Sequence, residues 1–132
     1  NFFNSNTYPE AGLSYVTVKH KNKFFVGKAR CHEDDPWSEL TGCRYAEMRA
    51  KIKALKDQHR QKKRACEECR KFVKAVMQYK NFDKESPSAR AMFRQLNRRI
   101  REVNKLADKI NAMEFSLQAA INAQIKIQNK QK

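Results

Sequence analysis

Apolar and polar residues alternate with a period of two near the start of the chain. Between Leu13 and Ala29, β-branched and aromatic residues stand on both sides of the polar segment His20–Lys23, a pattern typical of a β-hairpin. The alternation divides the first strand into two sets, Tyr15 and Thr17 on one face and Val16 and Val18 on the other. Because an isolated hairpin is marginally stable in water, the rest of the chain must cover part of it. The first twelve residues supply either a third strand or an extended arm, and the sequence leaves both open.

The period changes to the helical one after Pro36. Asp35 is suited to cap a helix N-terminus, and Pro36 to occupy the first helical position, where its missing N–H would be unpaired anyway. From Tyr45 on, mostly apolar positions recur at alternating steps of three and four: Tyr45, Met48, Ile52, Leu55, His59, Lys62, Cys66, Cys69, Val73 and Val76. This spacing predicts one long helix over residues 36–80 with a coiled-coil seam.

A second seam with the same spacing follows a turn. The turn segment ends with Ser86, a candidate N-cap, and with Pro87 at the first helical position. The seam comprises Ala89, Met92, Leu96, Arg99, Val103, Leu106, Ile110, Met113, Leu117 and Ala120, and it is widened by Phe93, Ile100, Ala107 and Ile121. We therefore expect a second helix over residues 87–130.

The two predicted helices are of similar length, about 40 residues and about 60 Å each. A connection of about six residues between them favours an antiparallel hairpin in which facing residue numbers sum to about 167. The facing pairs are then Val73 with Arg94, Cys66 with Arg101, His59 with Asp108, and Ile52 with Phe115. The sequence thus predicts a single α+β domain over residues 1–132. Its N-terminal β-hairpin region, residues 1–35, packs on the base of a long antiparallel two-helix coiled-coil hairpin.

The chain carries a large positive charge that is unevenly distributed. Its 132 residues include 29 Lys and Arg but 14 Asp and Glu, so the formal net charge is +15. Residues 60–101, the part of the helical hairpin nearest the turn, hold fourteen Lys and Arg against four acids, and hence +10 of that charge. Cations gathered in one region without alternating acids favour a polyanionic partner over a surface that is merely solvated.

Nucleic acid or another polyanion is the partner that this composition favours. Arg, which outnumbers Lys eight to six in residues 60–101, contacts phosphate with a planar fork and stacks on unpaired bases. We expect eight cations to bind it: Arg60, Lys63, Arg64, Arg70, Lys71, Arg94, Arg98 and Arg101. Lys62 and Arg99 are weaker candidates because they occupy seam positions. The alternative, from another class of function, is a protein-binding coiled-coil adaptor or homodimer whose basic face meets an acidic protein.

Four cysteines raise the question of a metal site. Cys66 and Cys69 have the Cys-x-x-Cys spacing of zinc sites, but both lie on seam positions, where a thiol serves as a small apolar residue. Cys31 and Cys43 lie toward the other end of the predicted helical hairpin. We therefore expect reduced thiols and no cofactor, while a zinc-dependent protein remains a further hypothesis.

Enzymatic machinery is not indicated. The sequence has no phosphate-binding glycine loop, no nucleophile elbow and no pair of carboxylates spaced for acid–base chemistry. His59, predicted beside Asp108, is expected to fix the register of the helices rather than to transfer a proton. We therefore expect a protein that is not an enzyme.

The aromatic residues of the first 45 positions have two interpretations. We expect five of them to form a small core between the sheet and the first turns of the long helix: Tyr15, Phe24, Phe25, Trp37 and Tyr45. The alternative is that some of them present a stacking surface, as sheet aromatics do in several RNA-binding modules.

A resemblance suggests a biological setting. Residues 24–35, reading Phe-Phe-Val-Gly-Lys-Ala-Arg-Cys-His-Glu-Asp-Asp, together with Ser38–Cys43 and Ala46–Ala50, resemble a pattern in small accessory proteins of bacteriophages and prophages. The resemblance implies a binding role in the cytoplasm of an infected bacterium, such as blocking a nucleoprotein of host defence, including a CRISPR effector. No membrane partner is expected, because no apolar run approaches the roughly 20 residues of a membrane span.

Overall fold

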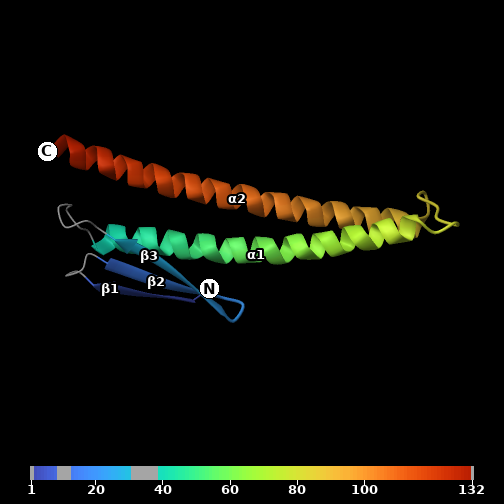
Figure 1. Ribbon diagram of the computed structural model, residues 1–132, viewed down its shortest axis with the longest axis horizontal. Coiled ribbons are helices and arrows are strands. Elements are labelled where there is room, and N and C mark those ends of the chain that lie inside the picture. Colours follow the sequence, from blue (N-terminus) through green and yellow to red (C-terminus); the bar gives the residue numbers. More distant parts are fainter. Residues whose placement is uncertain (1, 9–12, 31–38, 132) are drawn as a thin grey trace. The chain divides into compact units, whose positions relative to one another are not determined.

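The fold is α+β, as the sequence predicts. A computed structural model describes residues 2–8, 13–30 and 39–131. Three strands precede two long helices: β1 (Phe2–Tyr8), β2 (Leu13–His20), β3 (Lys23–Arg30), α1 (Glu39–Met77) and α2 (Pro87–Gln131) (Figure 1). The chain divides into two compact units, which are described in turn. Unit 1 comprises Asn1–Lys56 and Ile110–Lys132, and unit 2 comprises Asp57–Lys109.

The sheet of unit 1 is antiparallel throughout, with the strand order β1-β2-β3. The first residues of the chain therefore form a third strand, which settles the alternative that the sequence left open. His20 pairs with Lys23, so the hairpin turn contains only Lys21 and Asn22, with φ angles of 48° and 65°. Two successive residues in the left-handed region are typical of the tight turns whose twist matches that of the flanking strands.

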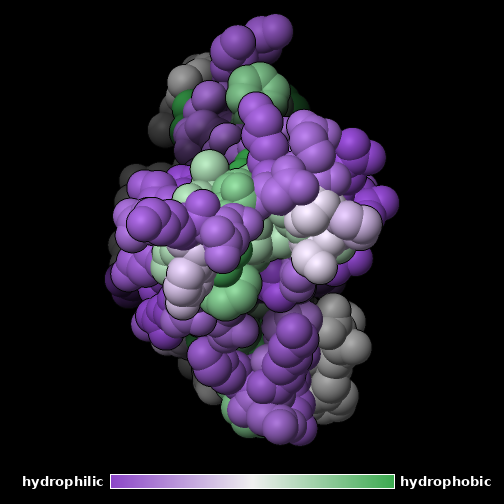
Figure 2. All heavy atoms as spheres, turned by 90° about the vertical axis from the view of Figure 1, so that its right-hand side faces the viewer, coloured by the Kyte–Doolittle hydropathy of each residue, from purple (hydrophilic) through white to green (hydrophobic). Residues whose placement is uncertain are grey.

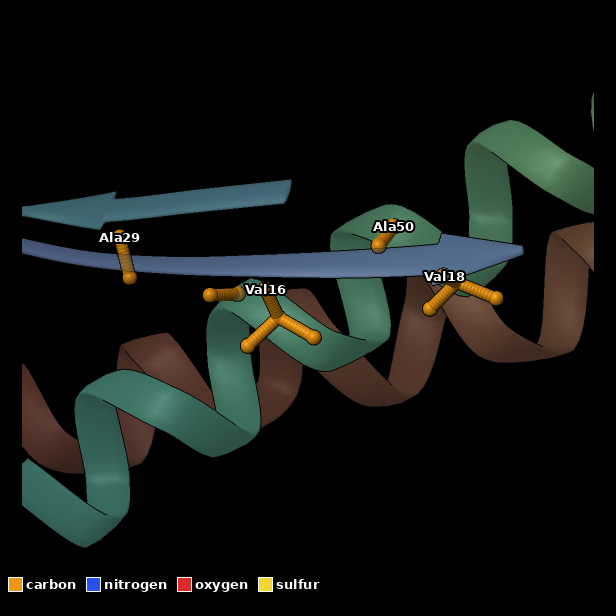
Figure 3. Close-up of a cluster of buried hydrophobic side chains, with 5 residues drawn as sticks. Val16, Val18, Ala29 and Ala50 are labelled. Atoms are coloured by element: carbon orange, nitrogen blue, oxygen red, sulfur yellow. The ribbon is translucent and has the colours of Figure 1, made fainter. Parts of the chain in front are cut away.

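One face of the sheet packs on the first turns of α1. Val16, Val18 and Ala29 from the strands form a buried cluster with Ala46 and Ala50 of the helix (Figure 3). The predicted division of β2 into two faces is confirmed, because Val16 is 1% exposed whereas Tyr15 and Thr17 are half-buried. The helix side of the contact consists of alanines, so its backbone lies close to the sheet.

Gly27 makes this close approach possible. A Cβ atom built at Gly27 would lie 1.8 Å from the Ala46 carbonyl oxygen and 2.6 Å from the Ala50 amide nitrogen. Both atoms belong to the helix backbone, which cannot turn aside as a side chain could. Only glycine therefore fits at this position of β3.

Two cations of α1 bind the last strand of the sheet. Arg49 donates a hydrogen bond from Nη1 to the carbonyl oxygen of Lys28, and Lys53 donates from Nζ to that of Val26, at 2.7 Å. β3 is an edge strand, so the backbone N–H and C=O groups on its outer edge could otherwise pair with another strand. The two side chains thus fasten the helix to the sheet and occupy acceptors of β3.

The antiparallel register of the helices agrees with the predicted sum of about 167 to within one turn. In unit 2, Lys62 Nζ lies 3.5 Å from a Glu102 carboxylate oxygen, a pair whose numbers sum to 164. In unit 1, Lys56 lies 2.9 Å from Glu114, which gives a sum of 170. Also in unit 1, the Tyr45 hydroxyl donates to the carbonyl oxygen of Ala120 at 3.3 Å.

The seam residues are buried or half-buried along α1, and along α2 with a single exception, Ala120, which is exposed. Ile52 and Phe115, predicted to lie near each other, do not share the core, because Phe115 is 77% exposed while Ile52 is buried. Phe115 follows Glu114, which pairs with Lys56, and it lies outside the three-four spacing of the seam.

The predicted contact between His59 and Asp108 is also wrong. Asp108 is exposed, and no hydrogen bond joins the two among the described residues.

The connection between the helices comprises residues 78–86, longer than the predicted six, because α1 ends at Met77. The Ser86 hydroxyl accepts a hydrogen bond from the Ala89 amide at 3.2 Å, and Pro87 is the first helical residue, so the predicted cap is confirmed. Phe82 and Phe93 meet edge to face, with ring centroids 6.2 Å apart. This contact packs the connecting segment against the beginning of α2.

Ser86→Ala should lower the stability of unit 2 by about 1 kcal/mol, because the Ala89 amide loses its acceptor at the helix N-terminus. Urea denaturation followed by circular dichroism measures the change. Ser88→Ala is the matched control, since Ser88 is exposed and lies inside the helix. Equal destabilisation by the two variants would contradict the capping role.

The prediction that Phe24 belongs to the core is wrong, because its side chain is 62% exposed. The pairing of β2 with β3 sets Phe24 opposite Lys19, on the face away from Val18. Tyr45 does pack against the core cluster, while Tyr15 and Phe25 are half-buried. Trp37 lies outside the described residues, as do the predicted cap Asp35–Pro36 and Cys31.

Candidate nucleic-acid interface

All eight predicted binding residues lie in unit 2, and all eight are exposed. Five belong to α1 and three to α2: Arg60, Lys63, Arg64, Arg70 and Lys71, then Arg94, Arg98 and Arg101. Figure 2 looks onto the end of unit 2 that carries the turn and shows hydrophilic side chains over most of that face, with apolar ones among them. Exposed apolar residues of this region include Phe72 and Tyr79.

The cations of α1 share one face of the helix but are mixed with acids. Steps of three, four and seven residues from Arg60 place Lys63, Arg64, Arg70 and Lys71 within one broad stripe. Glu67 falls inside this stripe, and Arg60 is 3.3 Å from the Asp57 carboxylate. Part of the positive charge of α1 is therefore offset locally.

The cations of α2 form a more regular row. Arg94, Arg98, Arg101 and Lys105 follow one another at steps of four, three and four, and all are exposed. These four residues, here called the α2 basic stripe, extend about 17 Å along the helix. Among the described residues, none of the four has a carboxylate within 4.0 Å. Like charges one turn apart repel and destabilise a helix, so a polyanion placed along the stripe would relieve this repulsion.

Lys62 and Arg99 are turned toward the seam, as their heptad positions predict. Both are half-buried. Lys62 is paired with Glu102, whereas the Nε atom of Arg99 is buried and has no hydrogen-bond partner in the described part of the chain. Because both side chains are half-buried, neither belongs to the exposed cations of the candidate interface.

Sequence analysis missed Lys105, which extends the α2 basic stripe beyond residue 101. The spacing signal was present, because Lys105 stands four residues after Arg101. The net charge of a segment does not distinguish the faces of a helix, so it does not reveal this row.

The cysteines that the structure describes are free thiols. Cys66 is buried, and Cys43 and Cys69 are half-buried. Within residues 2–8, 13–30 and 39–131, no group of three or more His, Cys, Asp or Glu side chains is arranged to hold a metal ion.

Comparison of the chain with models of known protein families, with curated proteins and with solved structures finds no match. None of the helices, over the residues described, is both long and apolar enough to cross a bilayer.

Proposed function

We propose that unit 2 binds nucleic acid through the α2 basic stripe and the exposed cations of α1. The observation that carries this proposal is the row of exposed arginines and lysine on α2 without acidic partners among the described residues. Such residues lose no intramolecular ion pair when they meet phosphate, and each phosphate that they neutralise releases condensed counterions.

The regular spacing suits the repeated charge of a phosphate backbone. The cations of the α2 basic stripe recur about every 5–6 Å along one line of the helix. A phosphate backbone offers charge at every nucleotide, so a row of cations can contact it repeatedly. Binding through the backbone would be independent of base sequence.

The biological role that we propose for this binding is inhibitory and not enzymatic. A basic surface that competes for phosphates can occupy the nucleic-acid-facing surface of a bacterial nucleoprotein and block it. A host defence complex such as a CRISPR effector is the target that the resemblance to phage accessory proteins favours.

A protein-binding adaptor or homodimer is the second candidate. It is favoured by the polar residues in the seam of unit 2, where the Nε atom of Arg99 lacks a hydrogen-bond partner among the described groups. A buried polar group without a partner weakens the intramolecular seam, which a second copy of the chain or an acidic partner could then share.

A gel-shift titration of duplex and single-stranded nucleic acid over salt tests the proposed function. Four phosphate contacts, one for each cation of the α2 basic stripe, predict a slope of about −3.6 for the logarithm of the binding constant against the logarithm of salt concentration on duplex DNA. This slope corresponds to a loss of about 150-fold between 0.05 and 0.2 M salt. Affinity that hardly changes with salt would contradict phosphate binding and favour the protein-binding candidate.

A further inference from the structure

The face of the sheet that is turned away from α1 carries exposed apolar side chains. Residues directly opposite in an antiparallel pair project to the same side. Three pairs of β2 and β3 therefore share this outer face: Tyr15 with Lys28, Thr17 with Val26, and Lys19 with Phe24. Phe24 is 62% exposed and Val26 is 36% exposed, although both are large apolar residues.

Two aromatic rings on this face each form a cation–π contact with a lysine. Lys19 Nζ lies 5.7 Å from the centre of the Phe24 ring, and Lys28 Nζ lies 5.6 Å from that of Tyr15. The two ring–cation pairs are separated by four residues of β2, about 13 Å along the strand. Between them the face carries Thr17 and Val26, so the two ring–cation pairs flank a pair of β-branched side chains.

The charge of the sheet has a single sign. The segment from Leu13 to Arg30 contains five Lys and Arg and no Asp or Glu, and the segment of β1 contains no charged residue at all. Cations select an anionic partner, and exposed rings beside them offer stacking surfaces to flat groups. Single-stranded nucleic acid combines both features, whereas in a duplex the bases are already stacked on one another.

We infer that the outer face of the β-sheet is a second binding site, and that it takes single-stranded nucleic acid. A base stacks on Phe24, and the phosphates beside it contact Lys19 and Lys28. This site belongs to unit 1 and uses none of the cations of the α2 basic stripe. It therefore goes beyond the proposed function of unit 2 and would give the protein a preference for single strands.

The test measures fluorescence anisotropy of a labelled 12-nucleotide oligo(dT) and of a 12-base-pair duplex at 0.3 M salt. The full chain carries Arg94→Glu and Arg98→Glu, which weaken the α2 basic stripe. Phe24→Ala should weaken oligo(dT) binding by about tenfold and change duplex binding by less than about twofold, because stacking requires an unpaired base. Phe24→Tyr keeps an aromatic face and should remain within about threefold of the parent.

Two further variants control for packing and for simple hydrophobicity. Phe115→Ala removes another exposed ring, from α2 of the same unit, and should leave oligo(dT) binding unchanged. Phe24→Leu preserves an apolar side chain but no stacking face, so it should weaken binding as Phe24→Ala does. Circular dichroism checks that each variant is folded.

Three results would overturn the inference: equal binding by Phe24→Leu and the parent, equal losses in Phe24→Ala and Phe115→Ala, or no binding of oligo(dT) at all. Vesicles containing phosphatidylserine are tested in parallel. Binding of these vesicles that depends on Phe24, without binding of oligo(dT), would assign the face to a membrane surface instead. Failure of the proposed function would appear separately, as duplex binding that Arg94→Glu and Arg98→Glu do not reduce.

Discussion

Replacing Arg94 and Arg98 together by glutamate should weaken duplex binding by about 100-fold at 0.1 M salt, because two phosphate contacts are lost and two repulsive charges are added. The slope of the salt titration should become shallower by about 2 units, since each contact on duplex DNA contributes about 0.9. Gel shift or anisotropy over a salt series measures both quantities.

The matched control reverses two lysines at the same spacing on the same helix. Lys126→Glu with Lys130→Glu changes the net charge by the same amount, and both residues are exposed in unit 1. We expect its affinity for duplex to stay within about threefold of the parent, because these lysines lie outside the α2 basic stripe. If the control loses as much affinity as Arg94→Glu with Arg98→Glu, binding follows the net charge of the protein and not the stripe.

Gly27→Ala should destabilise unit 1 by about 3 kcal/mol, which is a large fraction of the stability of a small unit. The added methyl group would lie 1.8 Å from the Ala46 carbonyl oxygen, so α1 must move away from the sheet. That movement would also stretch the hydrogen bonds from Arg49 and Lys53 to β3. Urea denaturation measures the loss of free energy of unfolding, and amide hydrogen exchange in β2 and β3 localises it to unit 1.

Val26→Ala serves as the control for Gly27→Ala. Val26 neighbours Gly27 in β3 but is partly exposed on the outer face, so its truncation should change the stability by less than about 1 kcal/mol. Amide exchange in β2 should rise more in Gly27→Ala than in Val26→Ala. Equal rises in the two variants would mean that the contact between Gly27 and α1 is not tight.

Local patterns predicted the helical hairpin well because helices repeat within a short stretch of chain. The three-four spacing from Tyr45 to Val76 identified residues that are all buried or half-buried, and Ser86 with Pro87 marked where α2 begins. The same spacing identified Lys62 and Arg99 as residues turned toward the seam. Each of these features depends on contacts one helical turn apart or on one repeated interface.

The outer face of the sheet was harder to predict. Phe24 and Phe25 are adjacent and chemically identical, yet Phe24 is exposed and Phe25 half-buried. Which of the two faces the helix depends on the register of the hairpin, and a turn longer or shorter by one residue would shift that register. A shift of one residue would have exchanged the two rings.

The sequence alone determined the two helical seams, the cap at Ser86, the division of β2 into two faces and the concentration of positive charge in residues 60–101. These features follow from periodicity and composition, which are properties of neighbouring residues. The tertiary structure alone decided the need for glycine at position 27, the binding of β3 by Arg49 and Lys53 and the exposure of Phe24. Each of these depends on how closely a strand and a helix approach, and that distance results from packing between segments far apart in the chain.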